Sequence, residues 1–140
     1  MARTVLAIDP GSKRVGVAIS DPGGTFALPL VVVYRSGDDS YVERLAELAA
    51  SRGVDEVIVG LPLRLSGAQG PEADEARALA EALHSRLGVP VHLVDERLTT
   101  RQAEASLAGA GVGSRARRGR IDQVAAAVLL QGFLDSRVPK

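Results

Sequence analysis

The sequence of 140 residues contains no cysteine, no tryptophan and only two histidines. Without cysteine, the chain can form neither a disulfide framework nor a thiolate metal site. Two histidines do not make a zinc cluster, and we expect His84 in a helix and His92 in a strand, each as a surface or packing residue. Because aromatic residues are also scarce, valine, leucine and alanine must fill the core.

Long apolar runs are missing as well. No run reaches the roughly 18 residues that a membrane-spanning helix needs. The N-terminus leads almost directly into an expected strand, which disfavours a signal peptide. We therefore expect a cytoplasmic protein with no membrane partner. The length favours a single domain over residues 1–140 with a core of its own.

The chain has no net charge, because 17 basic residues balance 17 acidic ones. This balance does not support a general coat for nucleic acid, but the charges are unevenly distributed. Between residues 97 and 120, six arginines stand against one acidic residue. These arginines are Arg97, Arg101, Arg115, Arg117, Arg118 and Arg120. A local basic patch on a neutral protein fits a polyanion bound by one face, although a solvated loop would give the same pattern.

Apolar periodicity and turn residues predict the order of the secondary-structure elements. Three strands form an antiparallel meander, and two later strands follow helical crossovers, so we expect those two to join the sheet in parallel. The predicted fold is a mixed five-stranded α/β sheet with helices on both faces. The expected strands are 3–9, 15–20, 27–34, 56–60 and 91–94, the expected helices are 41–51, 72–87, about 99–108 and 120–134, and a glycine- and arginine-rich connection is expected over 109–119.

Acidic residues stand at the ends of two predicted strands. Asp9 ends the first strand and begins a tight Pro-Gly turn, while Asp95 and Glu96 end the fifth strand. The carboxyl ends of parallel strands share one edge of a sheet, where ligands bind. Because side chains alternate along a strand, we expect either Asp95 or Glu96 to join Asp9. The alternatives are an ordinary hairpin turn at Asp9 and a surface ion pair with Arg97.

A third carboxylate is expected on the core face of the last helix. By helical spacing, Asp122 shares that face with Ala125, Ala126, Leu129 and Phe133. A carboxylate there needs compensation, from the helix N-terminus or from a cation. Two or three carboxylates suit Mg²⁺ or Mn²⁺, and two such ions about 4 Å apart can assist phosphodiester cleavage. The arginine-rich segment before Asp122 would then hold a nucleic-acid backbone beside the ions.

Four motifs, taken together, resemble the YqgF family, also called RuvX, of Holliday-junction-resolvase-like proteins in the ribonuclease H superfamily. They occur in the family's order and span nearly the whole chain. The motifs are Asp9-Pro-Gly11-Ser-Lys-Arg14-Val-Gly16-Val-Ala18, Val59-Gly60-Leu61-Pro62, Asp95-Glu96-Arg97-Leu-Thr99-Thr100, and Ile121-Asp122-Gln-Val-Ala125-Ala126 with Leu129-Leu130-Gln131.

The resemblance implies a ribonuclease H-like fold and a nuclease that uses divalent metal ions. Asp9, Glu96 and Asp122 would be the catalytic metal ligands, with Asp95 in reserve for the middle position. The implied role is maturation of the 5′ end of pre-16S ribosomal RNA, with structured RNA or ribosomal precursor particles as partners. By analogy, the alternative is resolution of branched DNA junctions. Whether cleavage is endo- or exonucleolytic, and whether the protein is a monomer or a homodimer, stays open.

Supporting roles fall to the arginines. Arg14 and Arg97 are expected to contact phosphate or to neutralise the acidic cluster, and Lys13 is expected to be a solvated turn residue. Two rival functions fit part of the pattern. An actin-like ATPase or sugar kinase needs two such domains, and a P-loop is excluded because Val17 and Ala18 stand where lysine and serine or threonine are required. A non-catalytic ribosome assembly factor would not use buried carboxylates, which are costly to keep.

Overall fold

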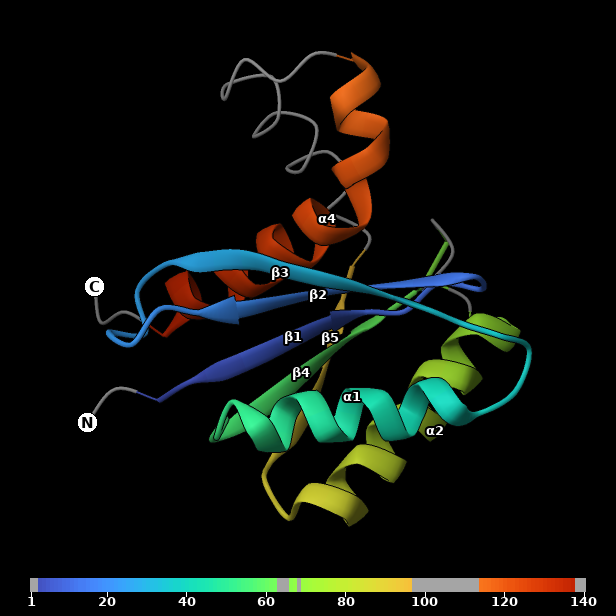
Figure 1. Cartoon of the computed structure of the whole chain (residues 1–140), viewed down its shortest axis with the longest axis horizontal. Coiled ribbons are helices and arrows are strands. Elements are labelled where there is room, and N and C mark those ends of the chain that lie inside the picture. The colour runs from blue at the N-terminus through green and yellow to red at the C-terminus, as the bar shows by residue number, and fades with distance from the viewer. Residues whose placement is uncertain (1–2, 63–65, 68, 97–113, 138–140) are drawn as a thin grey trace.

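The computed structural model of the chain describes residues 3–62, 66–67, 69–96 and 114–137, and for residues 114–123 it describes the backbone only. Within these residues, five strands form one mixed sheet (Figure 1). The strands are β1 (Val5–Asp9), β2 (Arg14–Ser20), β3 (Ala27–Tyr34), β4 (Glu56–Leu61) and β5 (Val91–Asp95). Their order across the sheet is β3-β2-β1-β4-β5. The pairs β1–β2 and β2–β3 are antiparallel, whereas β1–β4 and β4–β5 are parallel, which confirms the predicted sheet.

Helices cover both faces of the sheet, as Figure 1 shows. They are α1 (Ser40–Ser51), α2 (Pro71–Leu87) and α4 (Ser114–Ser136). Alternation along β1 divides the core into two layers. Leu6 and Ile8 belong to the apolar cluster beneath α1 and α2, while Val5 and Ala7 belong to the cluster beneath α4. Because β4 is buried on both faces, it forms the continuous apolar run that is typical of a central parallel strand.

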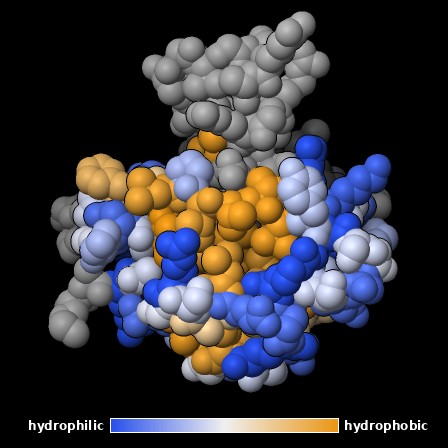
Figure 2. Space-filling model, viewed as in Figure 1, coloured by the Kyte–Doolittle hydropathy of each residue, from blue (hydrophilic) through white to orange (hydrophobic). Residues whose placement is uncertain are grey.

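The strand β3 lies at an edge of the sheet and carries a register shift. Pro29 pairs with Ala18, and the next paired residue of β3 is Val31. Proline has no N–H for the ladder, so an edge strand with a bulge accommodates it. Figure 2 shows an apolar area between β3 and α1 with hydrophilic residues around it. The half-buried Leu30 and Leu48 pack against the core there.

The prediction of a connection over 109–119 is wrong in its second half, because α4 already begins at Ser114. Arginine and alanine have high helix propensity, and a single interior glycine costs only about 1 kcal/mol. The later part of the helix is held against the sheet by buried Ala126 and Leu130, so the helix extends backwards from that anchor. The helix predicted over 99–108 lies outside the described residues. None of the described helices is both long and apolar enough to cross a bilayer.

The C-terminal end of α4 is attached to the sheet through a buried acid that the sequence pattern does not single out. Glu56, at the start of β4, is fully buried. Its two carboxylate oxygens accept hydrogen bonds from Arg137, each 2.5 Å long, and Oε2 also lies 3.0 Å from Nε2 of His92. The Arg137 guanidinium in turn lies 4.2 Å from the centre of the Phe133 ring. Burial raises the pKa of Glu56, but the hydrogen bonds and charges of Arg137 and His92 outweigh burial and hold it below its usual value.

Replacing Arg137 with methionine is expected to lower the free energy of unfolding by about 2 kcal/mol, because it leaves a buried carboxylate without its main cation. Urea unfolding at pH 7 measures this loss. Arg86→Met is the matched control, since Arg86 pairs with Glu43 on the surface and its removal should change stability by no more than about 0.5 kcal/mol. Equal losses in the two variants would contradict a structural role for the Glu56 ion pair.

Candidate active site

Asp9 is the last residue of β1 and stands where the chain turns into the β1–β2 hairpin. The turn is tight, because a Cβ atom at Gly11 would overlap with the backbone oxygen of Arg14. Arg35, which directly follows β3, stabilises the turn through hydrogen bonds. Its Nη1 donates a hydrogen bond of 2.8 Å to the Gly11 carbonyl and one of 2.5 Å to Glu75 of α2. The hairpin that follows Asp9 is therefore tied to the helical layer.

Glu96 approaches Asp9 from the end of β5, which lies beyond β4 in the sheet. It follows β5, and its backbone N–H donates a hydrogen bond of 3.3 Å to the carbonyl of Leu61 in β4. Its side chain is hydrogen-bonded to Asp9, whereas the neighbouring Asp95 is exposed. The predicted meeting of carboxylates from β1 and β5 is thus confirmed. The choice left open between Asp95 and Glu96 is resolved by the geometry in favour of Glu96 as the neighbour of Asp9.

Gly60 makes this meeting possible. The strand β4 lies between β1 and β5, so a side chain crossing from β5 to β1 must pass over it. A Cβ atom at Gly60 would lie closer than 3.0 Å to Oε2 of Glu96 and 3.2 Å from a methyl group of Leu129 in α4. Gly60 belongs to the motif Val59-Gly60-Leu61-Pro62, but the sequence alone predicted no role for it. The available signal was a glycine near the end of an otherwise apolar buried strand, which often marks a close approach.

The electrostatics of the pair are unusual. Burial raises the pKa of Glu96 to about 9, and the charge of Asp9, the hydrogen bond with Asp9 and the charge of Asp95 all act in the same direction. Oε2 of Glu96 is itself inaccessible to solvent. Two adjacent, half-buried carboxyl groups do not both ionise readily unless a cation compensates their charge, and without a cation they share a proton. The pair is therefore a place where a proton and a metal ion would compete.

The third expected ligand, Asp122, lies in α4, but its side chain is outside the described residues, so its predicted position remains untested. The helix does reach the carboxylate pair, because Leu129 contacts the region above Gly60. Ala126 and Leu129 are buried, which confirms that this part of α4 packs on the sheet, while Ala125 and Phe133 are only half-buried. Among the residues whose side chains are described, no group of three acids or histidines is placed to hold a metal ion.

The arginines predicted to contact nucleic acid are described unevenly. Arg14 begins β2 on the same hairpin as Asp9, and it is exposed. Arg97 lies outside the described residues. Four more belong to the first turns of α4, where only the backbone is described: Arg115, Arg117, Arg118 and Arg120. Figure 1 shows that this first part of α4 projects beyond the sheet, whereas the later part packs across it.

Residues 3–136 match the RuvX family, described as "Holliday junction resolvase". The chain belongs to the RuvX family. A protein from Thermobifida fusca is 52% identical over 139 residues, with 94% of this chain and 86% of the relative covered. One from Mycobacterium sp. (strain KMS) is 49% identical over 134 residues, with 94% and 79% covered. Both relatives are named "Putative pre-16S rRNA nuclease". Membership in the RuvX family makes the chain a nuclease, an enzyme that hydrolyses phosphodiester bonds.

Solved structures agree with the RuvX assignment at the level of the fold. Thermus thermophilus RuvC in complex with a Holliday junction substrate superposes with a TM-score of 0.66 at 22% identity, covering 96% of this chain and 95% of that one. Fowlpox virus resolvase with junction DNA superposes with a TM-score of 0.62 at 12% identity, covering 97% and 99%. The ribonuclease H-like fold of this RuvX chain is therefore confirmed. Divalent metal dependence and nucleic-acid binding are general to nucleases of this fold.

Proposed function

We propose that residues 1–140 form one nuclease domain that acts in the cytoplasm and hydrolyses phosphodiester bonds at the edge of the sheet where Asp9 meets Glu96. The observation that carries the proposal is the half-buried, hydrogen-bonded carboxylate pair, whose members come from the ends of two different strands and meet above a glycine. Such a pair has little structural value, because it raises the pKa of Glu96 and so disfavours the charged form. It has clear chemical value as a cation site beside a phosphate.

The donor set fits a hard divalent cation. Carboxylate oxygens are the ligands that Mg²⁺ and Mn²⁺ prefer, and the chain contains no thiolate to favour a softer metal. Asp9 and Glu96 would hold the metal, with Asp122 as third ligand and Asp95 in reserve, and we propose that two ions bind. When bound, such ions would neutralise the charge that develops on the phosphodiester and would assist activation of the attacking water.

The protein's own residues would position the substrate. Arg14 lies across the β1–β2 turn from Asp9 and would hold a backbone phosphate next to the carboxylate pair. Arg97 and the arginines at the start of α4 would extend this contact along the backbone. The half-buried position of the carboxylates limits their contact with bulk water, which strengthens the charge interactions that they make.

We propose the 5′ end of pre-16S ribosomal RNA as the substrate, in free RNA or in ribosomal precursor particles. The names of the relatives support this choice, since they match nearly the whole chain at about half identity. A branched DNA junction is the second candidate, because the family description names that activity. Cleaving a junction symmetrically would favour a homodimer, whereas trimming one RNA end would need only a monomer.

The test compares a labelled precursor 16S RNA and a four-way DNA junction in Mg²⁺, Mn²⁺ or EDTA. Asp9→Asn and Asp122→Asn are expected to reduce metal-dependent cleavage by about a thousandfold, because each removes a charge that binds the ions. Asp74→Asn is the matched control, since Asp74 is an exposed acid in the first turn of α2 and should leave cleavage unchanged. The preferred substrate identifies the reaction.

The opposite outcome is equally clear. Absence of cleavage of either substrate, together with unchanged nucleic-acid binding in Asp9→Asn, would overturn the proposal. The chain would then be a non-catalytic ribosome assembly factor with a nuclease fold. Cleavage that persists in EDTA would instead overturn the metal-dependent mechanism alone.

A further inference from the structure

We propose that the β1–β2 hairpin and Tyr34 form a binding site for one unpaired nucleotide next to the cleaved phosphate, with the base stacked on the Tyr34 ring. The proposal rests on the function proposed above and narrows its substrate class to nucleic acid with a single-stranded segment at the site. Neither Tyr34 nor Lys13 has a role in the catalytic proposal.

The site is a hollow at the end of the hairpin. A cavity of about 480 Å³ is lined by Gly11, Ser12, Lys13, Arg14 and Tyr34. Cavities of this size accept small ligands. None of the five lining residues is acidic, and two are cations. The carboxylate pair lies at the base of the same turn, since Asp9 pairs with Gly16 just below it.

Tyr34 stands on a well-fixed backbone but exposes its side chain. It is the last residue of β3 and pairs with Arg14 across the β2–β3 ladder. Its carbonyl accepts a hydrogen bond from Arg44, and the next residue, Arg35, donates its N–H to the carbonyl of Lys13 over 2.9 Å. Nevertheless, 63% of Tyr34 is exposed. An exposed aromatic ring on a rigid backbone is a suitable stacking platform, because little flexibility is lost on binding.

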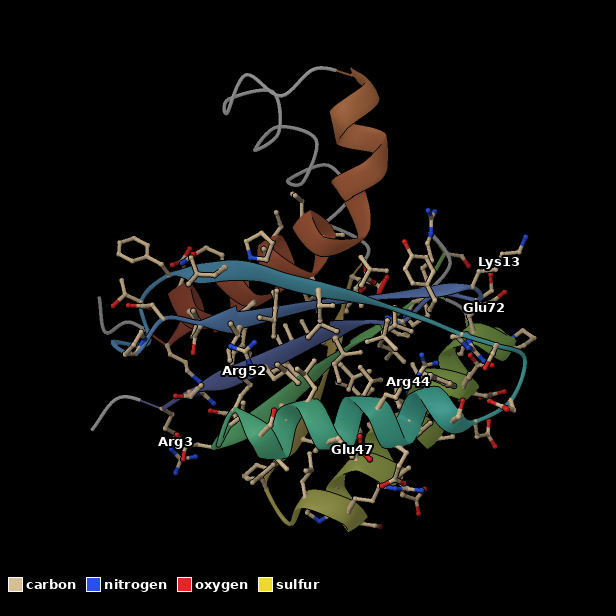
Figure 3. All side chains as sticks on the ribbon, viewed as in Figure 1. Arg3, Lys13, Arg44, Glu47, Arg52 and Glu72 are labelled. Carbon is tan, nitrogen blue, oxygen red and sulfur yellow. The ribbon has the colours of Figure 1, made fainter. Side chains whose placement is uncertain are left out.

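The charges beside the ring fit the other half of a nucleotide. Arg14 is the first residue of β2, and Lys13 directly precedes it. Figure 3 shows Lys13 extending from the hairpin into solvent. A base on Tyr34 would therefore have its phosphate within the field of two cations. Fully paired duplex cannot use this platform, since its bases are stacked on one another. The site thus selects nucleic acid that is unpaired beside the cleaved bond, such as the single-stranded end of an RNA.

The test measures binding, in EDTA so that cleavage does not interfere. The probe is an RNA hairpin with a 5′ single-stranded overhang that carries the fluorescent base 2-aminopurine. Wild-type protein is expected to quench the fluorescence by stacking. Tyr34→Leu should abolish the quenching and weaken binding about tenfold. Tyr34→Phe retains an aromatic ring, so it should quench the probe and bind it as wild type does. A blunt-ended RNA duplex should bind wild type and Tyr34→Leu equally well.

Phe26→Leu is the matched control, because Phe26 just precedes β3 at its opposite end and is also 63% exposed. It should bind the overhang as wild type does. The proposal is overturned if Tyr34→Leu and Phe26→Leu behave alike, if Tyr34→Leu weakens blunt duplex as much as the overhang, or if wild type does not quench the probe. Because none of these readouts involves cleavage, a failed nuclease assay and a failed stacking site are distinguishable.

Discussion

Replacing Glu96 with glutamine is expected to reduce cleavage by about a thousandfold and, in the absence of metal, to make the protein more stable. The two effects come from the same cause. In the native protein the carboxyl group of Glu96 has a pKa of about 9, because it is buried next to Asp9. Glutamine has nearly the same shape and carries no charge, so it removes the electrostatic cost together with the cation ligand.

The pH dependence gives this prediction its sign. Between about pH 4.5 and pH 9 the native state keeps a proton on Glu96 that the unfolded chain releases. Stability of the metal-free wild type therefore falls as pH rises through this window, with a slope of at most about 1.4 kcal/mol per pH unit from this group. In Glu96→Gln that contribution to the slope should vanish. Added Mg²⁺ should restore stability to wild type at high pH and have less effect on the variant.

Thermal unfolding in EDTA and in Mg²⁺, at pH 5 and pH 8, measures these effects. The conservative change Glu96→Asp serves as a second variant, because it retains a carboxylate but shortens the reach across Gly60. The prediction is contradicted if Glu96→Gln is less stable than wild type at pH 8 in EDTA. The carboxylate would then stabilise the fold itself and would not be kept for binding a cation.

Replacing Gly60 with alanine is expected to impair stability and catalysis together. The added methyl group would overlap with Oε2 of Glu96 and crowd Leu129, so both side chains would have to shift. Overpacking of this kind in a close-packed core costs about 1–3 kcal/mol. Because the displaced groups include a proposed metal ligand, we also expect cleavage to fall by about a hundredfold, which is the usual result of misplacing reacting groups by an ångström.

Gly132→Ala supplies the control for this prediction. Gly132 lies in α4, and apart from its chain neighbours and the nearby backbone of its own helix, a Cβ atom there would meet nothing within 4 Å. Alanine in a helix is favoured over glycine by up to about 1 kcal/mol, so this variant should be slightly more stable and fully active. Urea unfolding and steady-state cleavage of the preferred substrate measure both variants. A Gly60→Ala protein with wild-type activity would show that Glu96 is not held in place by its contact above Gly60.

The sheet could be predicted because its signals are local. The apolar run of β4, the hairpin turn after Asp9 and the helical crossovers each follow from residue spacing alone. The meeting of Asp9 with one of the two acids at the end of β5 also followed, since parallel strands share an edge. Selecting Glu96 over Asp95 required the resemblance to a known family, because the end of β5 leaves open which of two consecutive residues turns inward.

Other parts of the site could not be read from the sequence. The role of Gly60 depends on a side chain that arrives from 36 positions further along the chain and passes directly over it. The burial of Glu56 depends likewise on Arg137, near the far end of the sequence. The start of α4 was missed for a different reason. Gly119 interrupts a run of helix-forming residues, and only packing of the later turns decides that the helix continues through it.

The construction of β3 also bears on how the protein avoids aggregation. An edge strand with apolar side chains is a template onto which another chain can add a strand, and β3 exposes Leu28 and borders an apolar area. Pro29 removes one hydrogen-bond donor from this strand, and the register shift beside it interrupts the regular spacing of the remaining groups. A long, flat stack of copies through β3 is therefore disfavoured. The irregularity at Pro29 therefore acts against edge-to-edge association of copies of the chain.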